Sequence, residues 1–348
     1  MRYRQRDAQD LEEAERRRHL KPASARRPER ARQKHPVELS GLNSAQPDDK
    51  AWTMAQAKVA WALENYGGFE AIYDRVGARL RDELLGQAVP EFFDVPELEK
   101  LHDPTKVPYH GFYFQKKGFP FLSHQLSDPN SLAAIQDYSG VIWPKGNNFF
   151  CNAAGKYAGH MQELAQMVHM MIIESLGLKD QYHSHIKSLT YSMRLSKYND
   201  DSFVKKFDDL VLPSHKDPNF ISIISQHKIK GLQVETFDGQ WIDIAPKPHA
   251  FVVLLGEAFM AWTNGRFQAP KHHVKMEGFE KRYSMVYSTL PSQKDNMIEI
   301  PKVLVDKEHP QLYKPFNYYE YLNFRFSDEG EKHDDTLKAY CGVEQIAT

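Results

Sequence analysis

The sequence has few cysteines, no long apolar run and almost no net charge. Its 348 residues include 2 Cys, too few for a disulfide-stapled scaffold or a cysteine-rich zinc module. No stretch approaches the roughly 18 consecutive apolar residues of a transmembrane helix. The 45 Lys and Arg residues are balanced by 46 Asp and Glu residues, which argues against nucleic-acid binding through bulk charge. We therefore expect a globular cytoplasmic protein without a membrane or nucleic-acid partner, whose thiols, Cys151 and Cys341, stay free.

Residues 1–34 differ in composition from the rest of the chain. They are rich in Lys and Arg and contain almost no large aliphatic residues. Such a segment cannot bury enough apolar surface to offset the entropy of ordering. It lacks the apolar core of a secretory signal, and its acidic residues argue against a transit peptide. We expect a basic, disordered tail that precedes the folded sequence.

The remaining chain contains no fixed-period repeat and no long flexible linker, so we expect one folded unit. Apolar periodicity predicts helices over 48–66, 76–89 and 154–177, which makes residues 35–180 mostly helical. A short strand over 69–73 follows the first helix. Helices first and strands second indicate an α+β fold with a sandwich or barrel core. Period-two patterns predict the later strands over 186–198, 219–226, 231–236, 240–244, 249–255, 271–277 and 282–289.

Two glycine dipeptides mark expected turns. Asp238-Gly239 lies between two of the predicted strands, where it fits a two-residue hairpin turn with positive φ at both central positions. Asn264-Gly265 marks a further turn.

A metal-binding pattern stands out in the second half of the chain. In an extended strand, residues two apart point to the same side, so His215 and Asp217 can bind one ion together. A third candidate ligand, His272, follows fifty-five residues after Asp217. Two histidines and one carboxylate occupy one face of an octahedral ion and leave three positions open, as in non-haem Fe(II) oxygenases. Zinc would prefer a tetrahedral site with fewer open positions.

A carboxylate-binding pattern follows the last histidine. Arg282 and Ser284 lie on one face of a predicted strand, ten and twelve residues after His272. An arginine offers a two-pronged fork for a carboxylate, and the hydroxyl adds a further donor. A dicarboxylate could therefore chelate a metal at one end and be bound by Arg282 at the other.

These motifs occur together in the order of a known family. Residues 36–343 resemble the plant-type 2-oxoglutarate/Fe(II)-dependent dioxygenases, and segments 213–219 and 282–284 look most like the AOP group. The resemblance implies a double-stranded β-helix (jelly roll) flanked by helices. Its catalytic core with a C-terminal helix would cover 181–343 and form one unit with 35–180. Supporting stretches are 64–70, 193–198, 231–234, 254–257 and 263–266.

The resemblance also implies the identity of the metal ligands. His215, Asp217 and His272 would bind Fe(II). The family pattern puts the distal ligand two residues before the valine, here Val274, which selects His272 over its neighbour His273. Adjacent residues of a strand face opposite ways, so only one of the two histidines can reach the metal.

For the cosubstrate, the resemblance implies that Arg282 pairs with the distal carboxylate of 2-oxoglutarate and that Ser284 hydrogen-bonds to it. Tyr198 matches a tyrosine that many relatives use for the same cosubstrate. Two positions depart from the pattern. Ser196 stands where many relatives have Asn, which puts that contact in doubt, and His273 stands where an Arg is common.

The implied activity is oxidation of a small, largely apolar secondary metabolite or hormone by hydroxylation, desaturation or dealkylation. The reaction would use Fe(II), 2-oxoglutarate and O₂ and would pass through a ferryl intermediate. Ascorbate is a further candidate cofactor. The protein is expected to be a monomer. The aromatic segment 313–322 fits either a pocket lid or the packing of a C-terminal helix. Trp143, Phe149 and Phe150 are candidates for a pocket wall or for core packing.

Two other functions stay open at this point. A non-catalytic jelly-roll module could hold a small ligand, although the complete ligand set argues against it. A metal-dependent hydrolase would leave the Arg282 and Ser284 pattern unexplained. The remaining histidines of interest are expected to be surface or packed side chains, since no carboxylate spacing supports a second metal site: His160, His169, His183 and His185.

Overall fold

The computed structural model describes residues 36–43, 50–96, 111–114, 121–198 and 209–344. These residues belong to a single compact unit that begins at Pro36. The predicted tail at 1–34 and the expected helix caps Asp48 and Asp49 lie outside the described residues.

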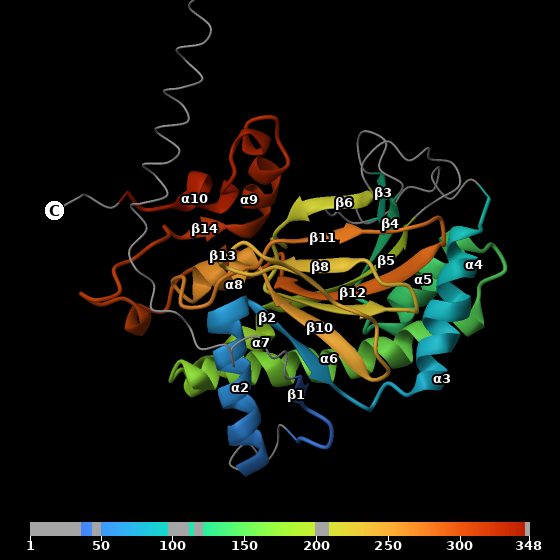
Figure 1. The fold of residues 1–348 in the computed structure, drawn as a ribbon, viewed down its shortest axis with the longest axis horizontal. Helices are drawn as coiled ribbons and strands as arrows, with labels where there is room; N and C mark the ends of the chain where they lie inside the picture. Colours follow the sequence, from blue (N-terminus) through green and yellow to red (C-terminus); the bar gives the residue numbers. More distant parts are fainter. Residues whose placement is uncertain (1–35, 44–49, 97–110, 115–120, 199–208, 345–348) are drawn as a thin grey trace, which may run out of the picture. The chain divides into compact units, whose positions relative to one another are not determined.

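The helices pack mainly on one face of the larger of two β-sheets (Figure 1). The longest, α6 (Asn148–Ser175), lies against that sheet, and its Met-rich stripe is buried as core. It begins six residues before the predicted start because the Asn147 side chain accepts a hydrogen bond from the Phe150 N–H. The other α-helices are α2 (Lys50–Tyr66), α3 (Ala78–Arg81), α4 (Val89–Phe93), α5 (Leu132–Ile142), α7 (Tyr182–Lys187), α8 (Glu257–Trp262), α9 (Tyr318–Arg325) and α10 (Thr336–Cys341). A π-helical turn, η2 (Asp82–Ala88), joins α3 to α4, and 3₁₀ turns are η4 (Lys179–Gln181), η5 (Lys302–Leu304) and η6 (Gly330–Lys332).

Eight strands form the larger sheet, in the order β1-β2-β10-β7-β12-β5-β4-β3. Pairing is antiparallel except between β1 and β2. Four of these strands come from the mostly helical part before residue 180, so that part helps to build the sheet as well as to cover it. Their bounds are β1 (Val37–Glu38), β2 (Gly68–Ile72), β3 (Gly111–Phe114), β4 (Phe121–Ser127), β5 (Leu189–Tyr198), β7 (Ile221–Gln226), β10 (Ala250–Leu255) and β12 (Arg282–Pro291).

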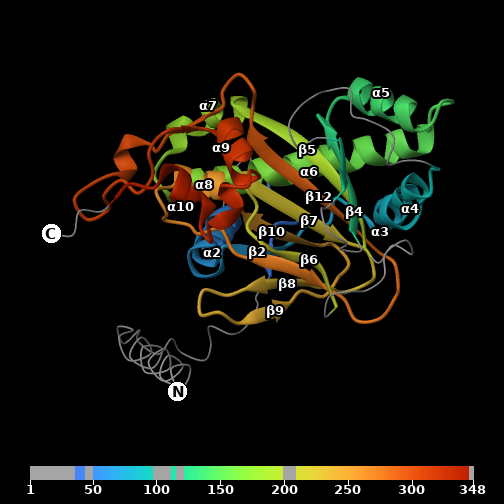
Figure 2. The ribbon, with the colours of Figure 1, turned by 90° about the horizontal axis from the view of Figure 1, so that it is seen from above.

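A smaller sheet of four antiparallel strands, in the order β6-β11-β8-β9, faces the larger one (Figure 2). This arrangement of two facing sheets with helices on the outer face is the jelly-roll core expected from the motifs. The four strands are β6 (Leu210–His215), β8 (Leu232–Glu235), β9 (Trp241–Asp243) and β11 (His272–Lys275). A further pair is formed by β13 (Met297–Ile298) and β14 (Phe316–Asn317).

The strands expected after residue 185 are all present, but the pattern missed six others: β1, β3, β4, β6, β13 and β14. In β4, the buried positions include Ser123, His124 and Gln125, so the strand lacks the apolar alternation that predicts one. β6 is short, and it contains Pro213 two residues before its last residue, His215. The polar character of β4 fits its place at the cavity, which Gln125 lines, a role that a local pattern does not reveal.

One turn differs from the prediction. In the hairpin between β8 and β9, only Gly239 has a positive φ, of 83°. The Gly239 N–H donates to the Thr236 carbonyl, and the Thr236 N–H donates to the Gln240 carbonyl. The prediction of a two-residue turn is therefore wrong. The chain instead makes a four-residue turn over 236–239, which ends in a left-handed glycine. At Asn264 and Gly265, φ is 53° and 70°, which confirms the second turn.

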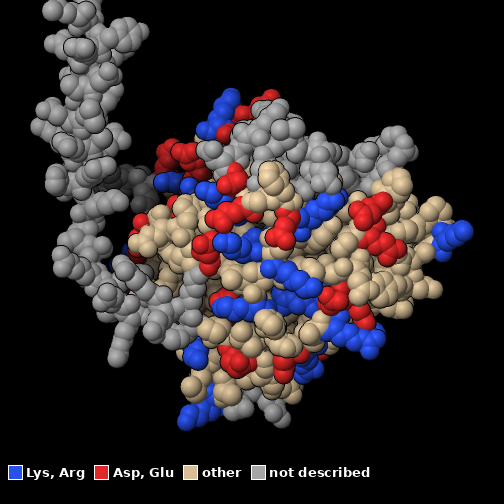
Figure 3. Space-filling model, turned by 45° about the vertical axis from the view of Figure 1, so that its right-hand side comes forward, with Lys and Arg blue, Asp and Glu red and all other residues tan. Residues whose placement is uncertain are grey.

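None of the described helices combines the length and the apolar character that crossing a bilayer would require. On the face that Figure 3 shows, basic and acidic side chains are intermixed.

The N-terminal end of α8 fixes the loop between β6 and β7. The Glu257 N–H donates to the Asp217 carbonyl at 2.8 Å, and the Gly256 N–H donates to the Phe220 carbonyl at 2.8 Å. Gly256 packs so closely on this loop that an added Cβ would lie 2.0 Å from the Asn219 carbonyl oxygen. Its φ of −100° is open to any residue, so the need for glycine here is steric.

We predict that Gly256→Ala lowers the free energy of unfolding by about 2 kcal/mol or more, because the new methyl group meets backbone that cannot yield easily. Urea denaturation would measure it. Gly159→Ala in α6, where nothing lies within 4 Å of the added Cβ, is the matched control. It should stabilise the protein by up to about 1 kcal/mol through helix propensity. Equal stability of the two variants would contradict the steric account.

Candidate metal centre and cavity

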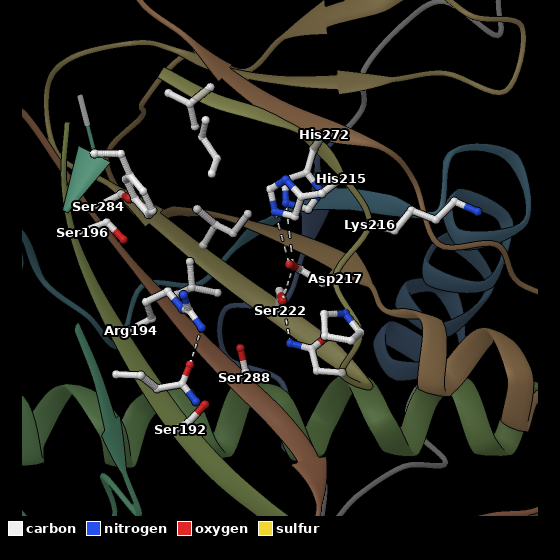
Figure 4. Close-up of a pocket in the computed structure, with 18 of the residues that line it drawn as sticks. Ser192, Arg194, Ser196, His215, Lys216, Asp217, Ser222, His272, Ser284 and Ser288 are labelled. Atoms are coloured by element: carbon white, nitrogen blue, oxygen red, sulfur yellow. Dashed lines mark hydrogen bonds and ion pairs between the residues drawn. The ribbon is translucent and has the colours of Figure 1, made fainter. Parts of the chain in front are cut away.

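A cavity of about 260 Å³ lies between the two sheets. Figure 4 shows the residues around it. The larger sheet supplies a polar wall from β5 and β12, and the smaller sheet and the β6–β7 loop supply the opposite side. Helix α9 contributes Tyr318, Tyr319 and Leu322 at one end, so part of the aromatic segment 313–322 does line the pocket.

Three side chains with metal-binding atoms converge in this cavity: His215, Asp217 and His272. All their ligand atoms lie within 4.8 Å of one another. The His215 Nε2 atom is 3.7 Å from Asp217 Oδ1, and the His272 Nε2 atom is 3.8 Å from Asp217 Oδ2. Among the residues that the structure describes, no other group of three His, Cys, Asp or Glu side chains has this arrangement.

The backbone brings these residues together by two different routes. His215 and His272 are paired partners in β6 and β11, so strand register alone places their rings 4.3 Å apart. Asp217 lies beyond the end of β6, in the loop that α8 holds. The expectation that His215 and Asp217 lie on one strand is therefore wrong. Their side chains do come together, but the loop places Asp217 there.

Hydrogen bonds fix the tautomer of His215 and orient the carboxylate of Asp217. His215 Nδ1 lies 2.8 Å from the Pro213 carbonyl, which can only accept, so Nδ1 carries the proton and a neutral ring leaves Nε2 free to bind a metal. The Ser222 hydroxyl donates to Asp217 Oδ2. Burial and the neighbouring His272 lower the pKa of His215 to about 3. Burial raises the pKa of Asp217, but the two histidines, Ser222 and Arg194 outweigh it, so this pKa is lowered overall.

The neighbouring histidine faces away. His273 stacks on Trp241 with ring centroids 3.8 Å apart, and its Nε2 lies 2.6 Å from the Gln233 side-chain oxygen. His272, in contrast, is 5% exposed and faces Asp217. Opposite orientation of adjacent strand residues is what separates the two rings.

Arg282 is the second polar feature of the cavity. It is only 1% exposed, and its guanidinium lies 4.6 Å above the Tyr198 ring centroid. One terminal nitrogen, Nη2, donates to the Gln226 side chain, and the Ser284 hydroxyl lies 3.2 Å from the Tyr198 hydroxyl. Arg282 Nε and Nη1 are buried and have no hydrogen-bond partner among the described residues. Burial lowers the pKa of Arg282.

These observations test whether Fe(II) and 2-oxoglutarate fit. Two unpartnered buried N–H groups on a charged side chain are costly, and a ligand carboxylate would satisfy both. Two imidazoles and one carboxylate are a donor set suited to Fe(II) with open positions. The residues present therefore fit the metal and a dicarboxylate chelating it.

A buried charge pair links α9 to the metal-binding loop. Arg325 forms a salt bridge with Glu257 and also donates to the Lys216 carbonyl at 2.7 Å. The Tyr321 hydroxyl donates to the same carboxylate at 2.6 Å. Burial raises the pKa of Glu257, while Arg325 and Tyr321 lower it in part. This cluster holds the peptide between His215 and Asp217, and sequence reasoning missed it because no local pattern connects residue 257 with 325.

Three aromatic residues predicted as candidates for the pocket wall do not line the cavity, whereas several polar residues that the prediction left out do line it. Phe150 and Trp143 pack together in the core near Phe92, and none of Trp143, Phe149 and Phe150 is among the residues that line the cavity. The pocket-wall alternative is thus wrong for them. The pattern also gave no role to several polar lining residues, although they alternate along their strands: Gln125, Ser192, Arg194 and Ser288.

Two of the other histidines are buried. His169 and His185 bond to each other at 2.9 Å, and His169 Nε2 lies 2.9 Å from the Thr289 hydroxyl. Burial lowers the pKa of His185 to about 4. They are packed, neutral side chains, as expected.

Comparisons with known proteins agree with this geometry. Residues 183–291 match the model of the 2OG-Fe(II) oxygenase superfamily. The Arabidopsis thaliana protein described as probable 2-oxoglutarate-dependent dioxygenase AOP1.2 is 33% identical over 309 residues, which cover 88% of this chain and 94% of the relative.

Solved structures share the fold. A rice dioxygenase for auxin oxidation superposes with a TM-score of 0.71 at 23% identity, over 89% of this chain and all of that one. JOX2, in a complex with 2OG, Fe and JA, gives a TM-score of 0.67 at 19% identity over 92% of each chain.

We predict that Arg325→Gln lowers the free energy of unfolding by about 3–5 kcal/mol, because it leaves the Glu257 carboxylate buried without its cation. Urea denaturation would measure the loss. Adding Glu257→Gln should restore part of it, since the unpaired charge disappears. Arg79→Gln, which breaks the exposed ion pair with Glu83, is the control and should leave stability unchanged. Wild-type stability of Arg325→Gln would exclude a structural role for the pair.

Proposed function

Because this chain belongs to the 2OG-Fe(II) oxygenase superfamily and is a 2-oxoglutarate- and Fe(II)-dependent dioxygenase, we propose that it oxidises a small organic molecule in the cavity between its two sheets. The observation that carries the proposal is the pair of unpartnered N–H groups of buried Arg282 in the same cavity as the His215, Asp217 and His272 cluster.

In this proposal His215, Asp217 and His272 hold the iron. When bound, Fe(II) and 2-oxoglutarate supply the activation of O₂ and the oxidising power for attack on a C–H bond. His215 presents Nε2 because Pro213 fixes its other nitrogen, and Ser222 orients the Asp217 carboxylate. These three side chains would supply three ligands to the iron, which would leave room for the cosubstrate and O₂.

Arg282, Ser284 and Tyr198 bind the distal carboxylate of 2-oxoglutarate. The buried guanidinium donates through Nε and Nη1, and the Ser284 hydroxyl adds a donor. Gln226 holds the third nitrogen of the fork and so fixes its plane. With so little water around it, this charge-assisted pair is stronger than it would be on the surface.

The chain itself orients the substrate and excludes water. The two sheets enclose the cavity, and Tyr318, Tyr319 and Leu322 of α9 cover one end. The lining contains both apolar and hydroxyl-bearing side chains, which supports a small substrate with polar as well as apolar parts rather than a purely apolar one. Hydroxylation, desaturation and dealkylation all remain within the proposal, and the monomeric state and cytoplasmic location stay predictions.

The ligand assignment predicts a difference between adjacent histidines. With anaerobic Fe(II), 2-oxoglutarate should give the weak visible charge-transfer band of its iron chelate in the wild type and in His273→Ala. His272→Ala should lose the band, because losing a direct ligand should cost more than the about 10–100-fold typical of residues behind the ligands. Absorption spectroscopy measures the result. A band in His272→Ala and none in His273→Ala would mean that the assignment is off by one residue, and no band in metal-loaded wild type would refute the proposal.

The cosubstrate assignment predicts the effect of Arg282. Arg282→Lys should weaken 2-oxoglutarate binding by about 10–100-fold, because an ammonium replaces one charge but not the fork. Calorimetry with Mn(II) in place of Fe(II) measures this without turnover. Mn(II) affinity in the absence of 2-oxoglutarate should stay unchanged. Unchanged 2-oxoglutarate affinity would remove Arg282 from the site.

A further inference from the structure

The inner faces of β5 and β12 carry a second Arg and Ser pair. Ser192 and Arg194 stand two residues apart on β5, as Arg282 and Ser284 do on β12. The strands are antiparallel and the order of Ser and Arg along them is reversed, so both pairs run the same way along one wall of the cavity. In register, Arg282 pairs with Tyr198, whereas Ser192 pairs with Ser288.

Distance separates the two pairs. Tyr198 and Arg194 stand four residues apart along β5, which is about 13 Å of strand. The Ser192 and Ser288 row also contains Ser222, whose hydroxyl donates to Asp217. The second pair therefore lies at the end of the wall nearer the metal-binding loop, and Figure 4 shows Arg194 directed into the cavity there, with Ser192 and Ser288 beside it.

The Arg194 side chain is held in a defined position. Its Nη2 donates to the Gln125 side-chain oxygen at 2.7 Å, and Nη1 lies 3.4 Å from the Ser123 hydroxyl. Both partners belong to β4 and are buried. Ser192 and Ser288 line the same cavity, so their hydroxyls can donate to a ligand there.

The other cations of the cavity have different places. Arg325 is paired with Glu257, and Arg282 belongs to the proposed cosubstrate site. The Lys216 side chain points away from the metal-binding cluster in Figure 4. Arg194, held by its bonds to β4, faces the cavity together with the hydroxyl-bearing side chains of Ser192 and Ser288.

We propose that Arg194, Ser192 and Ser288 form a carboxylate-binding site, so that the substrate is a small carboxylic acid. Leu290 continues the β12 wall beyond Ser288, and the Tyr319 hydroxyl of α9 donates to the Pro291 carbonyl next to it, which brings the lining residues Tyr318 and Leu322 of α9 to this end of the cavity. These residues take the apolar body of the acid. A guanidinium fork with flanking hydroxyls matches a carboxylate in shape and charge. This inference rests on the proposed function, because it places the acid beside the iron and 2-oxoglutarate.

Binding of matched acids and esters to the full chain tests the inference. The probes are benzoate, phenylacetate, 3-phenylpropionate and hexanoate, each with its methyl ester, titrated by calorimetry into protein loaded with Mn(II), both with and without 2-oxoglutarate. At least one acid should bind about tenfold or more tightly than its ester, because only the acid forms charge-assisted bonds. Arg194→Met should reduce the affinity for that acid to the level of the ester and leave 2-oxoglutarate affinity unchanged.

Two further variants keep the test sharp. Ser288→Ala, a small change that the fold tolerates more readily, should weaken acid binding by a few-fold and spare the ester. Lys216→Met removes a charge at the cavity edge and should leave acid binding unchanged.

Equal binding of acids and esters, full acid binding in Arg194→Met, or no acid bound at millimolar concentration would each overturn the inference. So would a loss of acid binding in Lys216→Met alone. Failure of the wild type to bind 2-oxoglutarate would instead refute the proposed function, and the titrations without 2-oxoglutarate would still report on the acid site.

Discussion

The short loop that carries Asp217 is the constraint on which the rest of the site depends. Strand pairing places His215 beside His272, but Asp217 stands outside any strand. Its position comes from the N-terminal end of α8, which donates backbone N–H groups to the carbonyls of Asp217, Pro218 and Phe220. If this contact shifted, two histidines would remain in register and the carboxylate between them would be lost.

The same loop connects the metal-binding cluster to α9 at one end of the cavity. Arg325 binds the carbonyl of Lys216 and the Glu257 carboxylate, so α9 is anchored on the loop that it helps to cover. Three other residues of α9 line the cavity. A substrate that packs against α9 therefore touches an element that is bonded directly to the peptide between two of the candidate ligands.

Polar residues of β4, β5 and β12 make one wall of the cavity polar. Such residues cost stability in a core unless they are hydrogen-bonded, and here several are paired across strands, as Arg194 is with Gln125. Others, such as Arg282 Nε and Nη1, are left for a ligand. The wall thus has a guanidinium with adjacent hydroxyl groups toward each end, and the metal-binding cluster lies opposite it.

The sequence by itself determined the fold class, the family and the grouping of His215, Asp217, His272 and Arg282, because short-range spacing and order carry those signals. The family resemblance also selected His272 over His273, and side-chain alternation, a local property of any strand, required that only one of them face the metal. It did not reveal β4, the loop geometry at Asp217, or the Glu257 and Arg325 pair. These depend on contacts between residues far apart in the chain, and a buried polar residue looks the same in a local pattern as an exposed one. Only the tertiary structure decided which serines and arginines face one cavity, because strand register sets that arrangement.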